Sequence, residues 1–340
     1  EIVSLNPEAV RNFELNRKIV YVDLSSVSSE QGIAKDLEIS FFKDAPGRAR
    51  RVIRVDDVIV STVRPYLKGF AQVPRYLDGQ VASTGFAVLR VVEDKTIPGF
   101  IWAIVRTEQF VAHLMERATG SSYPAVRPED ISSFGIELPP LDEQKRIVDV
   151  VSSVDAYIDA LQQQADTARA ARNAVLHELL SAGGDDWTET TLGELCELYQ
   201  PETISKAQMD DAAPYVVYGA NGPVGRYSRF NHEEPEVVVT CRGATCGVVN
   251  MTPPYCWITG NAMVVKPRDN RSIKGFLFWA LQTSVDVQAT ISGSAQPQIT
   301  RTGLEPSRIL VPPLVEQKRI VEIVSAMDDV IQSTEKAVVD

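Results

Sequence analysis

The stretch PPLDEQKRIVDVVSSVDAYID, from Pro139 to Asp159, occurs a second time as PPLVEQKRIVEIVSAMDDVIQ, from Pro312 to Gln332. Thirteen of the 21 positions are identical at a constant offset of 173 residues. The correspondence continues upstream without a gap, since Pro124 matches Pro297. A solenoid repeat has a much shorter period, roughly 20 to 50 residues. The chain therefore carries a duplicated globular domain, and the same helix follows each copy.

The repeated stretch predicts a long helix in each copy. Apolar residues alternate at spacings of four and three, with Arg172 as the one polar interruption, at Ile147, Val151, Val154, Ile158, Leu161, Ala165, Ala168, Val175 and Leu179. The second copy continues the pattern at Ile320, Val324, Met327, Ile331, Thr334 and Val338. This seam is typical of a coiled coil, so we predict that the two helices pack on each other. A helix lying only on its own domain would show a wider apolar face.

Proline and glycine mark the limits of the first helix. Pro139 and Pro140 fit its start, and Gly183 with Gly184 fits its end. At ~1.5 Å per residue this helix is a rod of roughly 60 Å. We therefore divide the chain into a globular domain over 1–138, a helix over 139–183, a second globular domain over 184–311 and a helix over 312–340.

Both globular domains contain short apolar strands separated by loops. Asp57-Val-Ile-Val-Ser in the first corresponds to Glu236-Val-Val-Val-Thr in the second. A further pair begins at Thr84 and Thr259, and a short helix is expected after it, around Gly99–Arg117 and Lys274–Thr290. Gly, Pro and Asn punctuate the loops between the strands. The fold class is therefore α+β, with a pseudo-two-fold internal repeat.

The composition is that of an ordinary globular protein. Hydrophobic residues make up 44% and charged residues 23% of the 340 positions, which allows two or three domains with real cores. No apolar run approaches the ~18 residues of a membrane span, and no secretion signal is recognised. The four cysteines all lie in the second half and are expected to be reduced thiols. We therefore expect a cytoplasmic protein without membrane contact.

The net charge of −11 is unfavourable for binding nucleic acid, but the distribution of charge matters more than its sum. Between Lys43 and Arg75, eight basic residues against three acidic ones give +5. Between Leu141 and Ser181, four basic residues against seven acidic ones give −3. The acidic residues thus lie largely on the connecting helices, and part of the first globular domain is basic.

Further motifs accompany the repeated helix in the second domain. They are WTETTLGEL (Trp187 to Leu195), YGANGPVGRY (Tyr218 to Tyr227), VVVTCRGATCGVV (Val237 to Val249), ITGNAMVV (Ile258 to Val265) and GSAQPQI (Gly293 to Ile299). Together with PPLxEQKRIV after each globular domain, they make the chain resemble the specificity subunit of type I restriction–modification systems over essentially its whole length. The first domain departs more, because it lacks the YGxxG loop and has GSSYPAV in place of GSAQPQI.

This resemblance implies a DNA-reading protein without catalysis of its own. Each globular domain would be a target-recognition domain for one half of a split site on double-stranded DNA. The helices would form an antiparallel coiled coil that sets the spacing between the halves. Two methyltransferase subunits would dock around the helices, and restriction subunits can join them. Adenine N6 methylation with S-adenosylmethionine, ATP use and cleavage would belong to those partners, so no cofactor is expected in this chain.

Basic and aromatic residues of the first domain are the leading candidates for DNA contact. Arginine and lysine bind phosphates and guanine. The candidates are Arg48, Arg50, Arg51, Arg54, Arg64, Tyr66, Lys68, Arg75 and Tyr76, with Ser121, Ser122 and Tyr123 of the GSSYPAV loop. A solvated basic face is the alternative for the arginines, and a turn or a helix cap is the alternative for the loop.

In the second domain the candidates lie in three loops. They are Asn221, Arg226, Tyr227 and Arg229 in the glycine-rich loop, Arg242 after the apolar strand, and Ser294 and Gln296 in GSAQPQI. Glycines let a backbone approach a ligand closely, but they also make ordinary turns. A structural salt bridge is the alternative for Arg242.

The charged part of the repeated motif is a candidate docking surface for a partner subunit. It comprises Glu143, Gln144, Lys145 and Arg146, and in the second copy Glu316, Gln317, Lys318 and Arg319. These residues could also stabilise the first turn of each helix, and the two roles are compatible. Because residues that are merely exposed would have drifted between the copies, we expect both roles.

Two rival functions stay open. The first is a self-sufficient or fused DNA adenine methyltransferase, because Thr252-Pro-Pro-Tyr255 is similar to the (N/D/S)PP(Y/F) tetrapeptide of amino-methyltransferases. Threonine is a poor first residue there, and no glycine-rich turn suits S-adenosylmethionine, so a turn is favoured. The second rival is a coiled-coil scaffold without DNA specificity. The scattered histidines and cysteines predict neither a metal site nor a catalytic residue.

The ends of the chain differ between the copies. The motif that starts at Trp187 has no counterpart before Glu1, which is not methionine. The second helix reaches only Asp340, the equivalent of Thr167, whereas the first runs on to Ser181. We therefore expect that the chain is clipped at the N-terminus and also at the C-terminus.

Overall fold

The computed structural model describes residues 2–10, 14–29, 32–34, 36–219, 221–293 and 296–339. The chain divides into two compact units, Glu1–Tyr157 and Ile158–Asp340. The boundary falls inside the longest helix, α4 (Leu141–Ser181), so its first part belongs to unit 1 and its remainder to unit 2. Among the described residues, no helix has the length and hydropathy required to span a lipid bilayer.

The described residues of unit 1 form two four-stranded sheets and a small hairpin. The first sheet has the order β1 (Val3–Leu5), β10 (Phe86–Val91), β7 (Val58–Ser61) and β8 (Phe70–Gln72), all antiparallel. The second has the order β5 (Ile39–Phe41), β2 (Lys18–Val22), β9 (Val81–Ser83) and β6 (Ala49–Val52), in which β2 and β9 are parallel. The hairpin pairs β3 (Val27–Ser28) with β4 (Gly32–Ile33). The helices are α1 (Pro98–Val105), α2 (Glu108–Arg117), α3 (Pro128–Ser132) and the start of α4, with four short 3-10 turns, η1 (Leu24–Ser26), η2 (Phe42–Asp44), η3 (Pro65–Leu67) and η4 (Arg75–Leu77).

The central strand β7 is buried on both faces, and its alternating side chains explain why. Val58 and Val60 pack in one core with residues of α1 and α2. Ile59 points the other way, into a core shared with Val22 of β2. Because successive strand residues face opposite sides, a continuous apolar run can serve two cores. The predicted strand Asp57–Ser61 is confirmed at this position.

Unit 2 repeats this arrangement. Its main sheet has the order β12 (Cys196–Tyr199), β18 (Ala262–Pro267), β15 (Val237–Thr240) and β16 (Val249–Met251). A three-stranded sheet orders β14 (Pro223–Tyr227), β13 (Tyr215–Tyr218) and β17 (Trp257–Ile258), with β13 parallel to β17. A further pair joins β11 (Thr188–Thr191) to β19 (Arg308–Val311). The helices are α5 (Leu192–Leu195), α6 (Lys274–Thr283), α7 (Arg301–Leu304) and α8 (Leu314–Val339), with 3-10 turns η5 (Lys206–Gln208) and η6 (Gln288–Thr290).

The alternation of β15 matches that of β7. Val237 and Val239 belong to the core that contains Phe276 of α6, whereas Val238 belongs to the core beneath the three-stranded sheet. The predicted strand at Glu236–Thr240 is therefore confirmed, and the two units share one plan. In each, a helix covers one face of the main sheet and a second sheet covers the other.

The helical segment after the main sheet differs from the prediction in unit 1. We expected one helix around Gly99–Arg117, but α1 ends at Val105 and α2 starts at Glu108. Thr107 explains the new start, because its hydroxyl accepts a hydrogen bond from Phe110 N as an N-cap. In unit 2, α6 ends at Thr283 and the shorter turn η6 follows it.

A buried glutamine attaches the start of α4 to unit 1. Gln144 has no exposed surface. Its Oε1 accepts from Thr96 Oγ1 (2.9 Å) and Ile97 N (3.2 Å). Its Nε2 donates to Lys95 O (3.1 Å) and Pro139 O (2.9 Å). The side-chain amide thus satisfies the backbone just before α1 and just before α4.

Gln317 does the same at the start of α8. It too has no exposed surface, and its Oε1 accepts from Ile273 N at 3.0 Å. Its Nε2 donates to Arg271 O (2.7 Å) and Pro312 O (2.8 Å). The glutamine of the repeated motif is therefore a structural bond between each long helix and the domain that precedes it.

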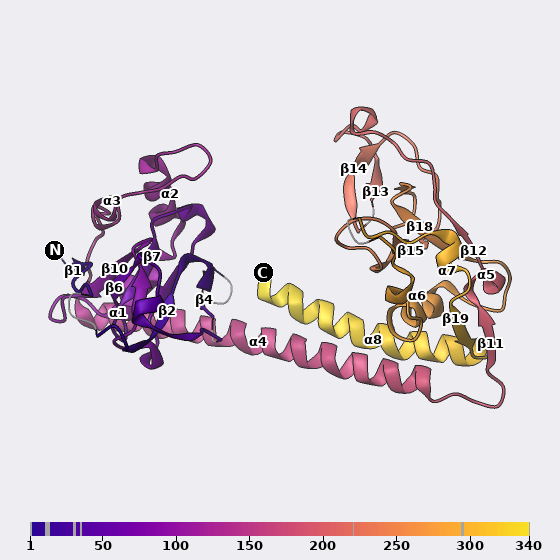
Figure 1. The fold of residues 1–340 in the computed structure, drawn as a ribbon, viewed down its shortest axis with the longest axis horizontal. Coiled ribbons are helices and arrows are strands. Elements are labelled where there is room, and N and C mark those ends of the chain that lie inside the picture. Colours follow the sequence, from indigo (N-terminus) through magenta and orange to yellow (C-terminus); the bar gives the residue numbers. More distant parts are fainter. Residues whose placement is uncertain are drawn as a thin grey trace. The chain divides into compact units, whose positions relative to one another are not determined.

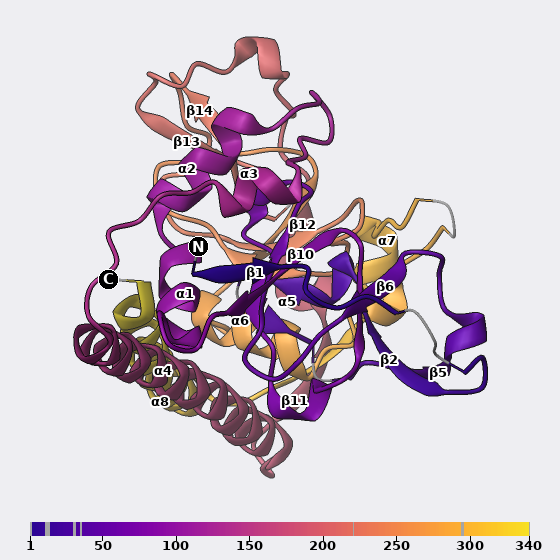
Figure 2. The same cartoon turned by 90° about the vertical axis from the view of Figure 1, so that its left-hand side faces the viewer.

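The predicted pairing of the two long helices is confirmed. In unit 2, α8 lies alongside the second part of α4 (Figures 1 and 2). Arg172 forms an ion pair with Asp328, and Arg169 forms one with Glu335. Because a lower number on α4 meets a higher number on α8, the helices run antiparallel.

Burial along the helices largely follows the predicted seam. Ala165, Ile320, Val324 and Ile331 are buried, whereas Val154 is 52% exposed. Two residues outside the predicted seam, Leu176 and Leu180, are also buried and join the main core of unit 2. The end of α4 therefore packs both on α8 and on the globular domain that follows it in the chain, not on the domain that precedes it.

Candidate nucleic-acid interface

In unit 1 the GSSYPAV loop runs beside the end of β7. Arg64 N donates to Pro124 O (2.7 Å), and Val126 N donates to Thr62 O (2.8 Å). This contact brings together two of the predicted DNA contacts. The guanidinium carbon of Arg64 lies 4.3 Å from the centre of the Tyr123 ring, in a cation–π contact.

Arg64 has an unusual backbone conformation. Its φ of 50° and ψ of 57° lie in the left-handed region, which costs a residue with a side chain about 1 kcal/mol. Its Nε is buried and has no hydrogen-bond partner among the described residues. The Tyr123 ring is 67% exposed, so the stacked pair reaches the surface.

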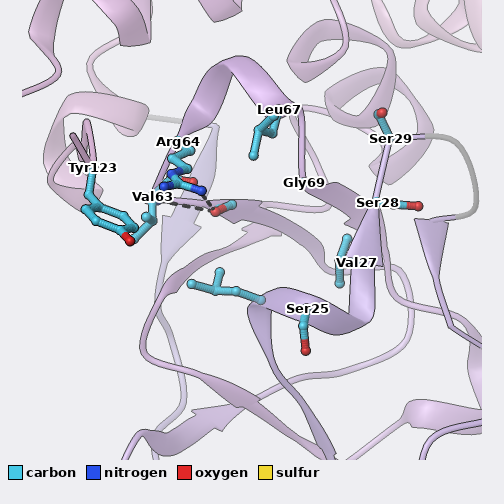
Figure 3. Close-up of a pocket in the computed structure, with 11 residues that line it drawn as sticks. Ser25, Val27, Ser28, Ser29, Val63, Arg64, Leu67, Gly69 and Tyr123 are labelled. Atoms are coloured by element: carbon cyan, nitrogen blue, oxygen red, sulfur yellow. Dashed lines mark hydrogen bonds between the residues drawn. The ribbon is translucent and has the colours of Figure 1, made fainter. Parts of the chain in front are cut away.

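An open cavity of about 520 Å³ adjoins this pair (Figure 3). Its walls combine hydroxyl groups with apolar side chains, and they are formed by Leu24, Ser25, Val27, Ser28, Ser29, Ser61, Val63, Arg64, Leu67, Gly69 and Tyr123. Sequence reasoning missed the serines between residues 25 and 29. Unlike Ser121 and Ser122, they do not lie in the repeated Gly-Ser loop, and only the fold places them near Arg64.

Other predicted contacts lie in the same two loops. Tyr66 is 47% exposed in the turn after Arg64, and Lys68 in that turn is paired with Glu108 at 2.5 Å. Ser121 and Ser122 are exposed beside Tyr123. The loop between β7 and β8 and the GSSYPAV loop therefore form one edge of unit 1, which we call the β7 edge.

The arginines around β6 have different surroundings. Arg48 is exposed, and its carbonyl accepts from Thr84 N at 2.8 Å. Arg50 is exposed and its guanidinium lies 5.8 Å from the Phe42 ring. Arg51 is half-buried, and its Nε has no hydrogen-bond partner among the described residues.

The remaining basic candidates of unit 1 lie at the start of β7, away from Arg64. Arg54 makes a two-bond ion pair with Glu8, at 3.0 Å from Nε and 2.7 Å from one terminal nitrogen. This contact lowers the pKa of Glu8 and raises the pKa of Arg54. Arg75 and Tyr76 are exposed in η4, beside the turn between β6 and β7. The basic window of the sequence is therefore divided between opposite ends of the central strand.

Unit 2 has an edge with the same backbone path. Gly243 N donates to Pro297 O (3.2 Å), and Ile299 N donates to Cys241 O (3.0 Å). Arg242 is exposed at this place, directly after β15. We call the end of β15 and the GSAQPQI loop the β15 edge.

Amide side chains dominate the β15 edge. Gln200 Nε2 donates to Gly260 O at 3.0 Å, and the carbonyl of Asn261 accepts from Cys241 N at 3.0 Å. Gln296, a predicted contact, is exposed in the loop, and the predicted contact Ser294 lies outside the described residues. Sequence reasoning missed the exposed residues Gln200, Asn261 and Gln298. Asn261 stands in the quoted ITGNAMVV motif, which offered a signal, whereas Gln200 offered none.

The glycine-rich segment of unit 2 lies in the hairpin of β13 and β14, and its candidate residues have different environments. Arg226, predicted to contact DNA, instead donates to two backbone carbonyls at 2.5 Å, those of Ala213 and Pro214. This side chain therefore holds the preceding loop in place, which gives Arg226 a structural role, and its contact with DNA stays a prediction. Asn221 and Arg229 are exposed.

Asn221 and Tyr227 of this hairpin contact residues outside it. Asn221 accepts a hydrogen bond from Asn250 of β16 at 2.8 Å. Tyr227 is half-buried and packs edge-on against Trp257, with ring centres 5.2 Å apart.

In both copies of the EQKR motif the glutamine is buried, whereas the charged residues are exposed or half-buried. Gln144 and Gln317 have no exposed surface, so these two are removed from the predicted docking patch. Arg146 pairs with Glu143 (3.1 Å) on the surface of α4. The equivalent pair on α8 joins Arg319 to Glu316 at 3.0 Å. Lys145 and Lys318 are exposed.

The thiols and the Pro-Pro segment have structural environments. All four cysteines are buried, and burial raises the pKa of Cys196 to about 12. Among the described residues, no cluster of His, Cys, Asp or Glu could hold a metal ion. Thr252 is buried and its hydroxyl accepts from Glu236 N at 2.9 Å, so it does not face a ligand site.

Comparison with known proteins identifies related sequences. A family model described as "Type I restriction modification DNA specificity domain" matches residues 69–168 and 184–339. The HindI specificity subunit of Haemophilus influenzae is 26% identical over 154 residues, 44% of this chain and 33% of that protein. The putative MjaX specificity subunit of Methanocaldococcus jannaschii is 22% identical over 283 residues, 73% of this chain and 65% of that protein. The chain thus spans between one third and two thirds of these curated relatives.

Solved structures are similar over nearly the whole chain. A chain from work on complex assembly and conformational transition of the type I R-M system is 26% identical, with a TM-score of 0.60 over 99% of this chain and 93% of that one. A type I restriction–modification S subunit from M. genitalium has a TM-score of 0.61 over 99% of this chain and 90% of that one. Its sequence identity is 15%, so that likeness concerns the fold alone.

Proposed function

Because this chain belongs to the family of type I restriction modification DNA specificity domains, we propose that it reads a bipartite DNA site and leaves the chemistry to partner subunits. Unit 1 binds one half of the site through the β7 edge, and unit 2 binds the other half through the β15 edge. The amino acids at the edges choose the bases, while basic residues elsewhere bind phosphates.

One observation carries this proposal. The two edges have the same backbone hydrogen bonds but different side chains, with Arg64 and Tyr123 on the β7 edge and Arg242 with amide residues on the β15 edge. Two readers that share a scaffold and differ in their contact residues can recognise two different sequences. The complete site then need not be a palindrome.

The long helices serve as spacer and docking surface in this proposal. α4 is a continuous helix of 41 residues that starts in unit 1 and ends in unit 2. Methyltransferase subunits dock on exposed parts of α4 and α8. The equivalent positions Tyr157 and Val330 support this idea, because both are apolar and 64% and 54% exposed. S-adenosylmethionine and the adenine N6 methylation belong to those subunits.

The proposal is tested with the chain assembled with its methyltransferase subunits. Selection from a library of random duplexes should yield two defined blocks of bases separated by a fixed number of undefined ones. A duplex with one block scrambled is the matched control and should bind with the affinity of random DNA. Equal binding to all duplexes would reduce the chain to an assembly scaffold. Methylation by the isolated chain would instead favour a self-sufficient enzyme.

A further inference from the structure

We propose that Arg64 reads a guanine in the half-site of unit 1, with the ring of Tyr123 as its platform. This inference rests on the proposed function and deepens it, because it names one specificity-determining residue and its base. The bases contacted by unit 2 are left open by it.

The position of Arg64 is the first argument. Gly243 is its counterpart in unit 2, since both donate their backbone N–H to the proline of the GSxxPxx loop. The two turns close in the same way, with Ser61 N bonded to Gly69 O (3.1 Å) and Thr240 N bonded to Val248 O (2.8 Å). The fold therefore does not require an arginine here, because glycine serves in the other unit.

The backbone conformation of Arg64 strengthens the argument that the fold does not require an arginine at this position. Both residues have positive φ, 50° for Arg64 and 87° for Gly243. Glycine adopts this region freely and arginine does so under strain. A residue that is strained, and that the scaffold does not need, indicates selection for its side chain.

The surroundings of the guanidinium are the second argument. Arg54, Arg90 and Arg106 of the same unit each form an ion pair with a carboxylate. Among the described residues no such pair is found for Arg64, which stacks on Tyr123 instead. The stack fixes the plane of the guanidinium and leaves its charge uncompensated.

The third argument is the shape of the site. The stacked pair borders the cavity of about 520 Å³, so a base edge can approach it without displacing the backbone (Figure 3). A planar fork of N–H donors matches the O6 and N7 acceptors that guanine presents in the major groove. Ser25, Ser28 and Ser29 line the same cavity. A phosphate contact would need neither the platform nor the concave wall.

Arg64→Gly is the most direct test. It copies the residue of unit 2 and relieves the strain, so it should fold at least as well as the original. In the complex with methyltransferase subunits, selection from random duplexes should show a preference for G at one position of the unit 1 block, about 10- to 100-fold. The variant should lose this preference and keep every other position of both blocks.

Matched variants sharpen the result. Arg64→Lys keeps the charge but loses the fork, so the preference should be only partly retained. Lys18→Ala removes an exposed basic residue at the start of β2, which is not among the candidate DNA contacts, and should leave all base preferences unchanged. In the unaltered complex, 7-deazaguanine at the selected position removes the N7 acceptor and keeps O6, so it should weaken binding, but less than Arg64→Gly does.

Other outcomes would overturn the inference. Uniform weakening on all sequences would make Arg64 a phosphate contact, and an unchanged pattern of preferences would remove it from the interface. Hydrogen exchange of β7 and β8 checks that the variants are folded. If the unaltered complex itself shows no base preference, the proposed function fails, which is a different result from a preference that Arg64→Gly leaves intact.

Discussion

The two units differ most at the end of the central strand and least at the start of the long helix. At the β7 edge Arg64 stands where the β15 edge has Gly243, whereas Gln144 and Gln317 make three equivalent hydrogen bonds each. The duplication has thus kept the bond that attaches domain to helix. It has changed the residues at the end of the central strand, where we propose that the two units differ in their contacts with DNA.

A buried acid at the start of the central strand gives the largest expected difference between the units. Asp57 accepts two hydrogen bonds from Arg90, both 2.8 Å, whereas its counterpart Glu236 is paired with Lys274 at 3.1 Å. The Oε2 atom of Glu236 has no hydrogen-bond partner among the described residues. Asp57→Asn should therefore destabilise unit 1 by about 3 to 4 kcal/mol.

Glu236→Gln should cost unit 2 only about 1 to 2 kcal/mol. Urea unfolding followed by hydrogen exchange in β7 and β15 measures the two units separately. Equal losses would show that the second hydrogen bond of Arg90 has no net effect on stability.

Replacing the buried glutamines Gln144 and Gln317 should give a smaller difference in stability between the two units. Thr96 donates its hydroxyl to Gln144, but the equivalent Ser272 has a buried hydroxyl without a hydrogen-bond partner among the described residues. Gln144→Ala should thus cost about 3 kcal/mol and Gln317→Ala about 2 kcal/mol, because each leaves buried backbone groups unsatisfied.

Hydrogen exchange in urea, followed at the first turns of α4 and α8, measures the loss of stability that each substitution causes. Lys145→Ala and Lys318→Ala are controls at neighbouring exposed positions and should have little effect. A larger loss for Gln317→Ala would contradict the hydrogen-bond count.

The smallest expected effect is a pH dependence of unit 2. Burial lowers the pKa of His232, and the nearby charges of Lys266 and Lys274 lower it further. Its Nδ1 donates to Asn231 Oδ1 (2.7 Å), and its Nε2 accepts from the Tyr199 hydroxyl (2.9 Å), so the folded state holds a neutral ring. The unfolded chain binds a proton more readily, so the stability of unit 2 should fall as the pH drops below ~6.5.

Thermal unfolding between pH 7.5 and 5.5 measures this effect. His232→Gln should make unit 2 less stable at neutral pH and should flatten its pH dependence. A variant that keeps the full dependence would assign it to another group.

The sequence predicted the framework better than the site. The long helices and the strands β7, β10, β15 and β18 follow from apolar periodicity, which depends on neighbouring residues only. Gln144 was read as part of a charged surface, because its hydrogen bonds to Thr96 and Ile97 join residues far apart in the chain. The basic residues between Lys43 and Arg75 were predicted to form one cluster. Arg54 and Arg64 are close in the sequence, but strand β7 lies between them and places them at its opposite ends.

Arg172 of α4 has a mechanical consequence. It is the one polar residue in the predicted seam of α4, and it lies between Asp328 and the ring of Trp279. Sliding α8 along α4 by one helical turn would break this contact and the Arg169–Glu335 pair together. Arg172 therefore fixes the register of α8 against α4, so the helix pair has one preferred alignment and resists sliding along its axis.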